Sequence, residues 1–290
     1  MRKILVLRGG ALGDFVVTLP ALAALRARWP GARIELVGNP TAAALGVARG
    51  LLDAAHSQHE RRWGTLHDPA PLPPGFAAWL ANFDLVLNYW PDPDGQLARH
   101  FPRHSAQRFL SAGPHPTLAP AAAHFCAPLR EFGFACPDLS YRLRSWQPDQ
   151  NSIAVHPGSG SATKNWSLAR WRQLCVWLRD TNLAEPVIVS GDAEPANLLA
   201  ELGQPLRSLP LNTLADRLAR CRLFIGHDSG VSHLAAACGP PCVLLFGPTN
   251  PAVWAPPGPH VHVVKRGPAL EAIPLADVQR TVGSVLQAQT

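Results

Sequence analysis

The 290-residue sequence contains no apolar run near the roughly 18 to 20 residues that a membrane-spanning helix requires. Its first apolar run, Ile4 to Leu7, is short and ends at Arg8, so the N-terminus also lacks the long apolar segment of a secretory signal. These absences predict a soluble protein that is not secreted.

Paired cysteine spacings are missing as well, because no C-x-x-C occurs. Several cysteines lie in apolar surroundings such as LAAACGPPCVLLF, which is typical of reduced core residues. We therefore predict neither a disulfide framework nor a zinc site, and we expect a cytoplasmic protein. The six cysteines are Cys126, Cys136, Cys175, Cys221, Cys238 and Cys242.

The sequence is also short of clustered histidines and of basic, aromatic-rich patches. His104, His115 and His124 are spaced too loosely for a metal site, and we expect them at the surface. The net charge is +6, but the arginines are spread along the chain. This pattern favours an anionic partner and argues against nucleic acid. A phosphorylated small molecule and an anionic membrane surface both remain open.

What is present is an alternation of strands and helices that occurs twice. With about 100 to 200 residues per domain, the length suits two domains. The alternation stops at the polar segment SWQPDQNS and then restarts, which predicts two doubly wound α/β domains, residues 1–146 and 147–290. A final helix near residues 275–290 is a candidate to pack back on the first domain.

Hydrophobic patterns place the individual elements. In the first half they predict a helix over 13–31 and strands over 2–8, 32–40 and 83–90. In the second half they predict strands over 186–192 and 241–249, and they predict a strand followed by a loop in each of the segments 152–160 and 222–230. The helices expected there cover 167–180, 196–203, 231–239 and 274–289.

The turn RGGALGD follows the first strand, where an α/β protein often binds a ligand. It does not fit the dinucleotide pattern G-x-G-x-x-G, because Arg8 stands at the position of the first glycine. Asp14 directly follows Gly13 at the start of the helix. The residue is therefore either a helix N-cap or a functional carboxylate, and the stretch alone leaves both open.

A second Gly-rich loop, HPGSGSATKNWS, follows the first strand of the second half. Small residues there let backbone N–H groups approach an anion, and Lys164 adds a positive charge. The P-loop spacing is absent, and a surface turn is the alternative. The candidate anion-binding residues are Ser159, Gly160, Thr163 and Lys164.

The segment GHDSGVSHLAAA lies where a strand ends and a helix begins. Free N–H groups and the positive end of the helix would favour a phosphate at this point. An N-cap followed by a structural histidine is the alternative. The candidate residues are Asp228, Ser229, Gly230 and His233.

Two acids in VIVSGDAEP, Asp192 and Glu194, come just after another strand. Carboxylates at this place commonly contact ribose hydroxyls, although either residue could equally cap a helix. A hydrolase triad is not indicated, because no G-x-S-x-G occurs.

Three segments together resemble glycosyltransferase family 9, the ADP-heptose:lipopolysaccharide heptosyltransferases and their relatives. They are LGDFVVTLPAL, HPGSGSATKNWSLARW and IGHDSGVSHLAAACGPPCVLLFGPTNPAVWAP, in the family's order and over most of the chain. The resemblance implies the GT-B fold, in which two Rossmann-like domains face across a cleft. It also implies that the N-terminal domain binds the acceptor and the C-terminal domain the nucleotide sugar.

On the acceptor side, the resemblance implies that Asp14 is the general base of an inverting single displacement. Arg8 and Gly13 belong to the same loop. The run Arg-Gly-Gly-Ala stands where better-known members carry Ser or Thr, and the middle of this domain is short and Pro-rich. These departures leave the acceptor open.

On the donor side, Lys164 and the amides of Ser229 and Gly230 resemble groups that hold the diphosphate without a metal. Glu194 resembles the acid that contacts ribose, with Asp192 as the alternative. Asp228 and His233 are expected beside the phosphates and the donor sugar.

The implied function is heptose transfer from ADP-heptose to a lipopolysaccharide-core or other glycan acceptor, without a cofactor. The acceptor implies a cytoplasmic enzyme, with peripheral contact at the inner face of the membrane as an option. Two alternatives are a sugar-nucleotide epimerase of GT-B shape and a nucleotide-sugar-binding protein without catalysis.

Overall fold

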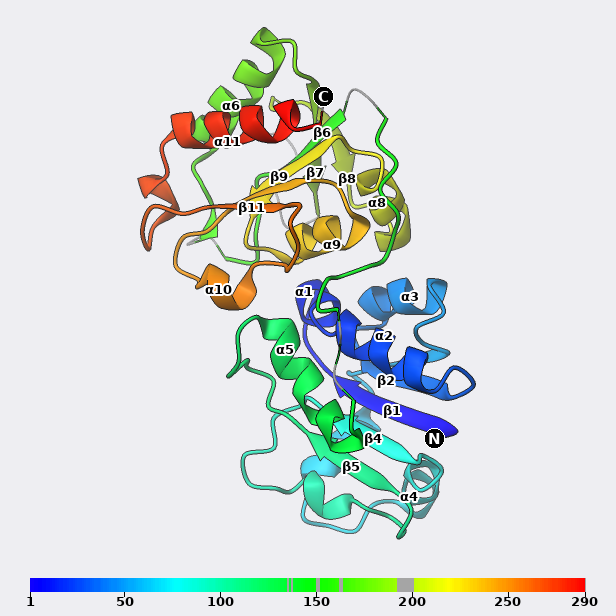
Figure 1. Cartoon of the computed structure of the whole chain (residues 1–290). Helices are drawn as coiled ribbons and strands as arrows, with labels where there is room; N and C mark the ends of the chain where they lie inside the picture. Colours follow the sequence, from blue (N-terminus) through cyan, green and yellow to red (C-terminus); the bar gives the residue numbers. More distant parts are fainter. Residues whose placement is uncertain (135, 137, 150–151, 162–163, 192–200, 290) are drawn as a thin grey trace. The chain divides into compact units, whose positions relative to one another are not determined.

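The computed structural model describes residues 1–134, 136, 138–149, 152–161, 164–191 and 201–289. The chain divides into two compact units, Met1–Leu139 and Ser140–Thr290 (Figure 1). The division falls slightly earlier than the boundary after residue 146 that the sequence suggested. Each unit is built on one parallel sheet, and the strand orders are those of doubly wound domains.

The first unit has a five-stranded sheet in the order β3-β2-β1-β4-β5. Its strands are β1 (Lys3–Arg8), β2 (Arg33–Gly38), β3 (Ala54–Ser57), β4 (Leu85–Asn88) and β5 (Arg108–Ser111). Its α-helices are α1 (Leu12–Val16), α2 (Leu19–Arg28), α3 (Pro40–Ala48), α4 (Pro74–Leu80) and α5 (Ala121–Cys126). Its 3₁₀ helices are η1 (Arg61–His67), η2 (Ala98–His100) and η3 (Ala127–Phe132).

The strand β1 is central and is buried on both sides, which explains its continuous apolar run. The long helix expected over 13–31 is wrong in one respect, because the structure divides it into α1 and α2. Pro20 lies in the first turn of α2 and has no N–H to continue the hydrogen bonding of α1.

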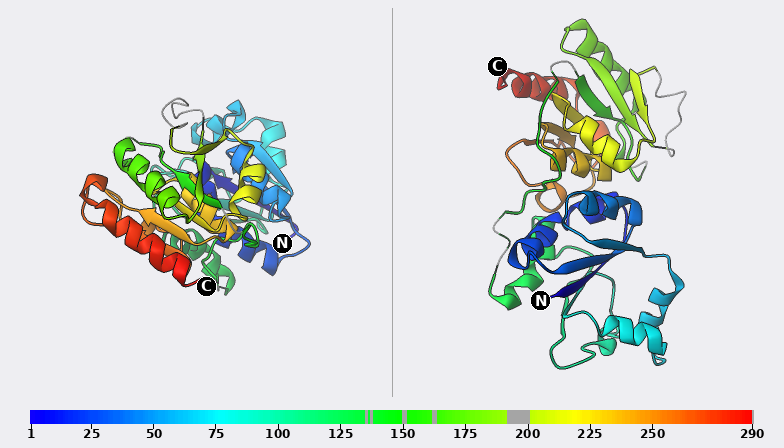
Figure 2. Two further views of the ribbon diagram at one scale, coloured as in Figure 1. Left: turned by 90° about the horizontal axis from the view of Figure 1, so that it is seen from above. Right: turned by 90° about the vertical axis from the view of Figure 1, so that its right-hand side faces the viewer.

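Both faces of this sheet are covered. On one face α2 contacts α5, and α1 contacts α3. On the other lie α4 and η1 (Figure 2). Leu80 of α4 and Leu66 of η1 belong to the same buried cluster as Leu5 and Leu7 of β1. Leu5 and Leu7 share one side of the strand because side chains alternate between the two faces.

The second unit has a six-stranded sheet in the order β11-β10-β9-β6-β7-β8. Its strands are β6 (Ser152–His156), β7 (Glu185–Ser190), β8 (Gln204–Arg207), β9 (Leu223–His227), β10 (Cys242–Leu245) and β11 (Val261–Val264). Its helices are α6 (Leu168–Asp180), α8 (Leu211–Leu218), α9 (Gly230–Cys238), α10 (Pro251–Trp254), η5 (Leu270–Ala272) and α11 (Leu275–Gln287). Across the described residues of the chain, no helix combines the length and apolar character needed to cross a membrane.

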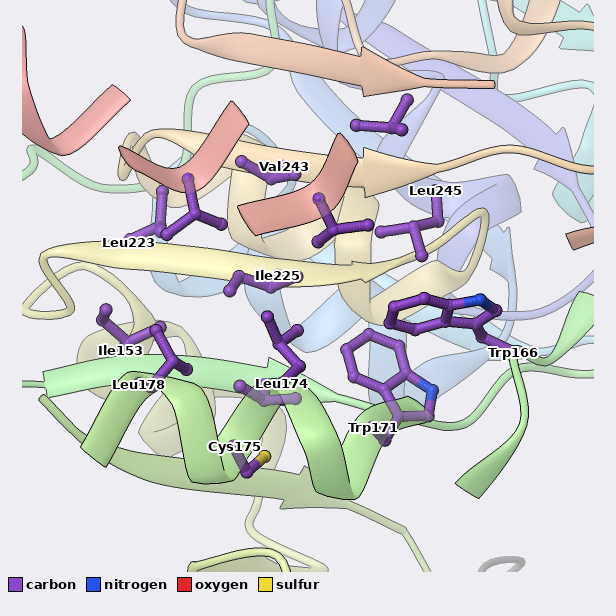
Figure 3. Close-up of a cluster of buried hydrophobic side chains, with 14 of the residues drawn as sticks. Ile153, Trp166, Trp171, Leu174, Cys175, Leu178, Leu223, Ile225, Val243 and Leu245 are labelled. Atoms are coloured by element: carbon purple, nitrogen blue, oxygen red, sulfur yellow. The ribbon is translucent and has the colours of Figure 1, made fainter. Parts of the chain in front are cut away.

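The core of this unit joins α6 and α11 to the central strands (Figure 3). Ile225 and Val243 of the sheet, Leu174 of α6, and Val278 and Val282 of α11 are all fully buried in this cluster. The apolar face of α11, which we considered for packing on the N-terminal domain, is therefore used within its own unit. The helix expected over 196–203 lies mostly outside the described residues.

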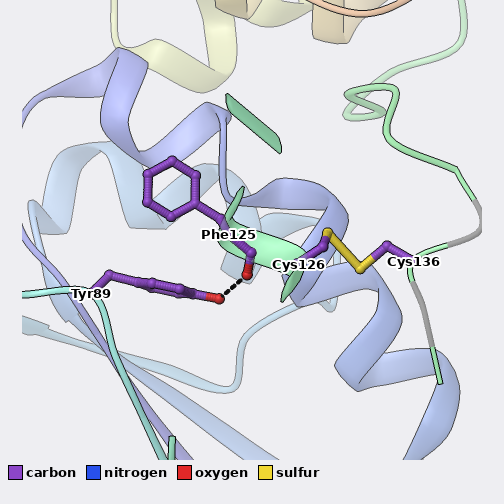
Figure 4. Close-up of a disulfide and its surroundings, with 4 residues drawn as sticks. All are labelled: Tyr89, Phe125, Cys126 and Cys136. Carbon is purple, nitrogen blue, oxygen red and sulfur yellow. Dashed lines mark hydrogen bonds between the residues drawn. A yellow bond between two sulfur atoms is a disulfide. The ribbon is translucent and has the colours of Figure 1, made fainter. Parts of the chain in front are cut away.

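One expectation about the cysteines is wrong. Cys126 and Cys136 form a disulfide, with Cα atoms 6.0 Å apart across a sequence separation of 10 (Figure 4). Cys126 ends α5, and η3 carries the chain through a helical turn that brings Cys136 back beside it. The remaining cysteines are free and buried, as the sequence predicted: Cys175, Cys221, Cys238 and Cys242.

The prediction that His124 lies at the surface is also wrong, because this side chain is buried on α5. Its Nε2 lies 2.8 Å from the Gly113 carbonyl oxygen. Since a carbonyl only accepts, Nε2 carries the proton, and the imidazole anchors the helix to the preceding loop.

Candidate active site

Each sheet has one point where the strand order reverses. In the first unit it lies between β1 and β4, and in the second between β6 and β9. Ligands of doubly wound proteins bind beyond the carboxyl ends of the strands at such points. The loops that follow β1, β6 and β9 carry the motifs singled out in the sequence.

Asp14 lies in the first turn of α1, beyond the end of β1. The N-cap is Ala11, so Asp14 is the third helical residue, and its Oδ2 accepts a hydrogen bond of 2.8 Å from the Ala11 N–H. The capping interpretation is therefore half right, since the carboxylate caps the helix from inside the first turn. The side chain is still 39% exposed, which leaves the carboxylate open to a ligand.

Arg8 holds the same carboxylate from the end of β1. Its Nη2 donates to Asp14 Oδ1 at 3.0 Å, and its Nε donates to the Asp14 backbone carbonyl, also at 3.0 Å. The guanidinium lies 4.4 Å from the centre of the Phe125 ring and is almost fully buried. Burial lowers the pKa of Arg8, and the negative charge of Asp14 opposes that shift.

The turn between these two residues depends on glycine. Gly10 has φ of +103°, and a Cβ there would come within 2.3 Å of Asp14 Oδ2. Any larger residue would be strained and would displace the carboxylate. Gly13 lies inside α1, where its carbonyl accepts from the Val17 N–H at 3.0 Å.

Two residues that sequence reasoning missed also touch this turn. The Gly10 N–H donates to Gln58 Oε1 at 3.0 Å. A Cβ on Gly9 would lie 3.2 Å from the indole nitrogen of Trp90, so this ring packs against the backbone of the turn. They follow β3 and β4, and only the folded sheet brings them beside the loop after β1.

In the second unit the charged centre is Asp228, directly after β9. Its Oδ2 accepts from Lys164 Nζ at 3.0 Å, and its Oδ1 lies 3.7 Å from His233 Nε2. Burial alone would raise the pKa of Asp228, but the contacts with His233 and Lys164 lower it to about 2. The loops after β6 and β9 thus meet in an ion pair.

His233 carries an unpaired polar atom. The side chain is 5% exposed, and within the described residues Nδ1 has no hydrogen-bond partner. The ring centre lies 5.8 Å from that of Tyr141, so one side of the imidazole is packed. A buried imidazole nitrogen without a partner is suited to receive a ligand atom.

The beginning of α9 lies beside the same carboxylate. Ser229 is the N-cap, and its Oγ accepts from the Ser232 N–H at 3.3 Å. Gly230 opens the helix, and the first N–H groups of a helix have no acceptor inside it. The helix terminus therefore offers both interpretations made from the sequence, a capped end and an anion site.

The loop after β6 is held by its own polar side chains. Ser159 Oγ lies 2.6 Å from Asn165 Oδ1 and 2.7 Å from the Ser161 carbonyl oxygen, while Gly160 faces open space. The loop continues into Trp166, whose backbone N–H donates to His227 Nε2 at 2.9 Å. Thr163, Asp192 and Glu194, also predicted at this site, lie outside the described residues.

His227 is neutral because it is buried. Its Nε2 accepts a hydrogen bond, and burial lowers its pKa to about 3. The residue ends β9 and holds the loop that follows β6, so it ties together the two segments that carry Lys164 and Asp228.

A model of glycosyltransferase family 9 (heptosyltransferase) matches residues 127–277, just over half of the chain. The chain belongs to glycosyltransferase family 9. This glycosyltransferase is 26% identical over 294 residues to lipopolysaccharide heptosyltransferase 1 of Pseudomonas aeruginosa, covering 86% of the chain and 79% of the relative.

Solved structures show the fold of the family 9 enzyme. The glycosyl transferase family 9 protein of Veillonella parvula DSM 2008 has a TM-score of 0.78 at 18% identity, covering 99% of this chain and 98% of that one. The E. coli heptosyltransferase WaaC with ADP has a TM-score of 0.71 at 19% identity, covering 98% and 99%. The expected GT-B fold class is confirmed.

Metal ligands do not gather in the described parts of this glycosyltransferase. No group of three or more His, Cys, Asp or Glu side chains there could hold a metal ion. The ammonium of Lys164 lies 3.0 Å from Asp228, and α9 begins two residues after this carboxylate, at Gly230.

Proposed function

We propose that this glycosyltransferase moves heptose from ADP-heptose to a lipopolysaccharide-core acceptor, with inversion at the anomeric carbon. Lipopolysaccharide heptosyltransferases are among its relatives, and a structure of similar fold was solved with ADP. We assign acceptor binding to the first unit and nucleotide-sugar binding to the second. The acceptor places the enzyme at the cytoplasmic face of the inner membrane.

The observation that carries this proposal is the Asp14 carboxylate. It is fixed on one oxygen by Arg8 and on the other by the Ala11 N–H, yet it stays partly exposed. Each carboxylate oxygen has two acceptor sites, so both oxygens keep capacity for the acceptor hydroxyl. As general base, Asp14 takes the proton while that hydroxyl attacks the anomeric carbon.

The leaving group is the nucleoside diphosphate. We assign its stabilisation to Lys164 and the N–H groups at the start of α9, because these groups lie on either side of Asp228. Fixed donors and charges aimed at the place where negative charge grows are an effective way to lower the barrier. His233 Nδ1 is a further group suited to contact the donor.

Ribose binding rests on the sequence motif alone. We assign it to Glu194, with Asp192 as the alternative, and we assign Thr163 to the phosphate loop. We propose no resident cofactor, since charge on the leaving group is met by side chains and helix N–H groups.

A transfer assay tests the proposal. The enzyme is incubated with ADP-heptose and a core oligosaccharide prepared without heptose, and the product's mass and anomeric configuration are measured. One added heptose of inverted configuration supports the proposal, and retention would overturn the single displacement. Turnover of the nucleotide sugar without acceptor would indicate the epimerase alternative. Thermal-shift measurements with ADP, UDP and GDP test which nucleobase the enzyme binds.

A further inference from the structure

A pocket lies in the second unit, away from the motifs used above. Its volume is about 490 Å³, within the roughly 300 to 1,000 Å³ of small-molecule sites. It is lined by residues that include Trp146, Pro241, His260, Arg280, Ser284 and Val285.

The pocket lies at the amino ends of the strands, whereas the nucleotide motifs lie at their carboxyl ends. Pro241 immediately precedes β10, and His260 immediately precedes β11. Lys164 and Asp228 instead follow the carboxyl ends of β6 and β9. Because β6, β9, β10 and β11 all run parallel, the amino ends of β10 and β11 lie on the opposite side of the sheet from the carboxyl ends of β6 and β9. No part of the proposed transfer reaction uses this pocket.

One wall is apolar and already rigid. Trp146 is 36% exposed, and its indole N–H donates to the Cys221 carbonyl at 2.9 Å. A Cβ on Gly239 would come within 3.0 Å of the Trp146 Cβ, so the glycine allows this close packing. With its N–H already bonded, the tryptophan offers only its ring. Val285 extends the apolar wall.

The polar side is cationic. Arg280 is 68% exposed and pairs with Asp277 at 3.1 Å, but Arg266 pairs with the same carboxylate. Two guanidiniums share one negative charge, so one positive charge is left over. None of the described residues that line the pocket is acidic. A desolvated anion would therefore find a partner in Arg280 and no repelling carboxylate on the wall.

We propose that this pocket binds a small amphipathic organic anion. Its apolar body lies on Trp146 and Val285, and its single carboxylate, phosphate or sulfonate pairs with Arg280. An organic cation is disfavoured, because Arg280 repels it. This site is independent of the proposed transferase function, so binding is measured without a sugar donor.

The probe is 1-anilinonaphthalene-8-sulfonate, an aromatic anion that becomes fluorescent when bound. Titration of the full-length enzyme should saturate at one probe per chain. Arg280→Gln should weaken the affinity by about tenfold or more, as expected when one hydrogen bond to a charged group is lost. Arg172→Gln is the matched control, because Arg172 is an exposed arginine of the same unit that pairs with Glu201 and does not line the pocket. Its affinity should stay within about twofold of wild type.

Two further arms test shape and ligand charge. Ser284→Trp places a large side chain at an exposed lining position and should abolish the saturable binding. Octanoate should displace the probe, whereas octanol should displace it at least tenfold less well. The proposal is overturned if wild type shows no saturable binding. Equal losses with Arg280→Gln and Arg172→Gln would also overturn it, and so would equal displacement by octanoate and octanol.

Discussion

The guanidinium of Arg8 donates two hydrogen bonds to Asp14, one to the side-chain carboxylate and one to the backbone carbonyl. A single buried cation thus fixes both the position of the α1 backbone and the direction of the carboxylate. Because the Ala11 N–H holds the second oxygen, rotation of the carboxylate breaks a hydrogen bond. The exposed edge of Asp14 is therefore presented in one orientation, as a base requires.

Asp14→Asn separates catalysis from capping. The amide oxygen still accepts from the Ala11 N–H, but the amide NH2 group then faces the buried Arg8 guanidinium, so the melting temperature should fall while the variant stays folded. An amide cannot take the acceptor's proton, and the transfer rate should fall by about 10² to 10⁴. Asp94→Asn, an exposed acid of the same unit, is the control. Transfer by Asp14→Asn at nearly the wild-type rate would reduce Asp14 to a helix cap.

Arg8 is expected to act by positioning Asp14. Arg8→Gln removes the charge and the two-point hold, and kcat should fall by about 100-fold. Arg8→Lys keeps the charge with one donor group, so it should recover part of that loss. Affinity for ADP, measured by calorimetry, should stay unchanged in both variants. If kcat is the same in Arg8→Gln and wild type, the hydrogen bonds to Asp14 have no catalytic role.

Lys164→Ala should weaken ADP binding by about 1.5 to 3 kcal/mol, the usual value of a hydrogen bond to a charged group. Lys3→Ala, an exposed lysine of the other unit, serves as the control. Calorimetry gives both affinities directly. Unchanged affinity in Lys164→Ala would exclude contact between this ammonium and the diphosphate.

His227 should make the enzyme less stable in acid. Its folded pKa of about 3 lies below the usual 6.5, so the unfolded chain takes up the proton first. The stabilisation that neutral His227 contributes is complete above about pH 6.5 and is lost as the pH falls, by about 2 kcal/mol at pH 5. Gln at this position can still accept from the Trp166 N–H. Urea unfolding at pH 7 and pH 5 should show a smaller loss in His227→Gln, and an equal loss would contradict the assignment.

The disulfide between Cys126 and Cys136 should stabilise the first unit by about 2 to 3 kcal/mol. A reductant should lower the melting temperature of wild type. The double variant Cys126→Ser/Cys136→Ser should melt near reduced wild type and should not respond to the reductant. Cys175 is free and buried in the other unit, so Cys175→Ala is the control. This variant should lose only the stability that comes from its own packing, and its response to the reductant should match that of wild type.

The sequence predicted the sheets well because their central strands are buried on both sides. Runs such as Ile4–Leu7 have no other stable place in a soluble protein, and the Gly-rich loops beyond them mark strand ends. The four short strands at the sheet edges, β3, β5, β8 and β11, were not predicted.

Contacts between segments that are distant in the chain could not be predicted from the sequence. Gln58 and Trp90 reach the loop after β1 only because strand pairing places their own loops beside it. The disulfide was missed for the same reason, since a spacing of ten residues has no local signature. The sequence singled out Asp14 as a candidate, but the hydrogen bonds that Arg8 makes to it depend on the turn at Gly10, whose geometry cannot be derived from the residue types alone.

The pairing of Lys164 with Asp228 has a consequence for turnover. If Lys164 holds the diphosphate, the departing nucleotide does not leave a bare ammonium behind, because Asp228 lies within reach to take it back. Product release then exchanges one ion pair for another, which lowers the barrier to dissociation. The same carboxylate competes with any incoming anion, so weakly charged ions such as chloride gain little by pairing with Lys164. With Lys164 in the proposed role, this arrangement favours rapid exchange of nucleotides over tight retention.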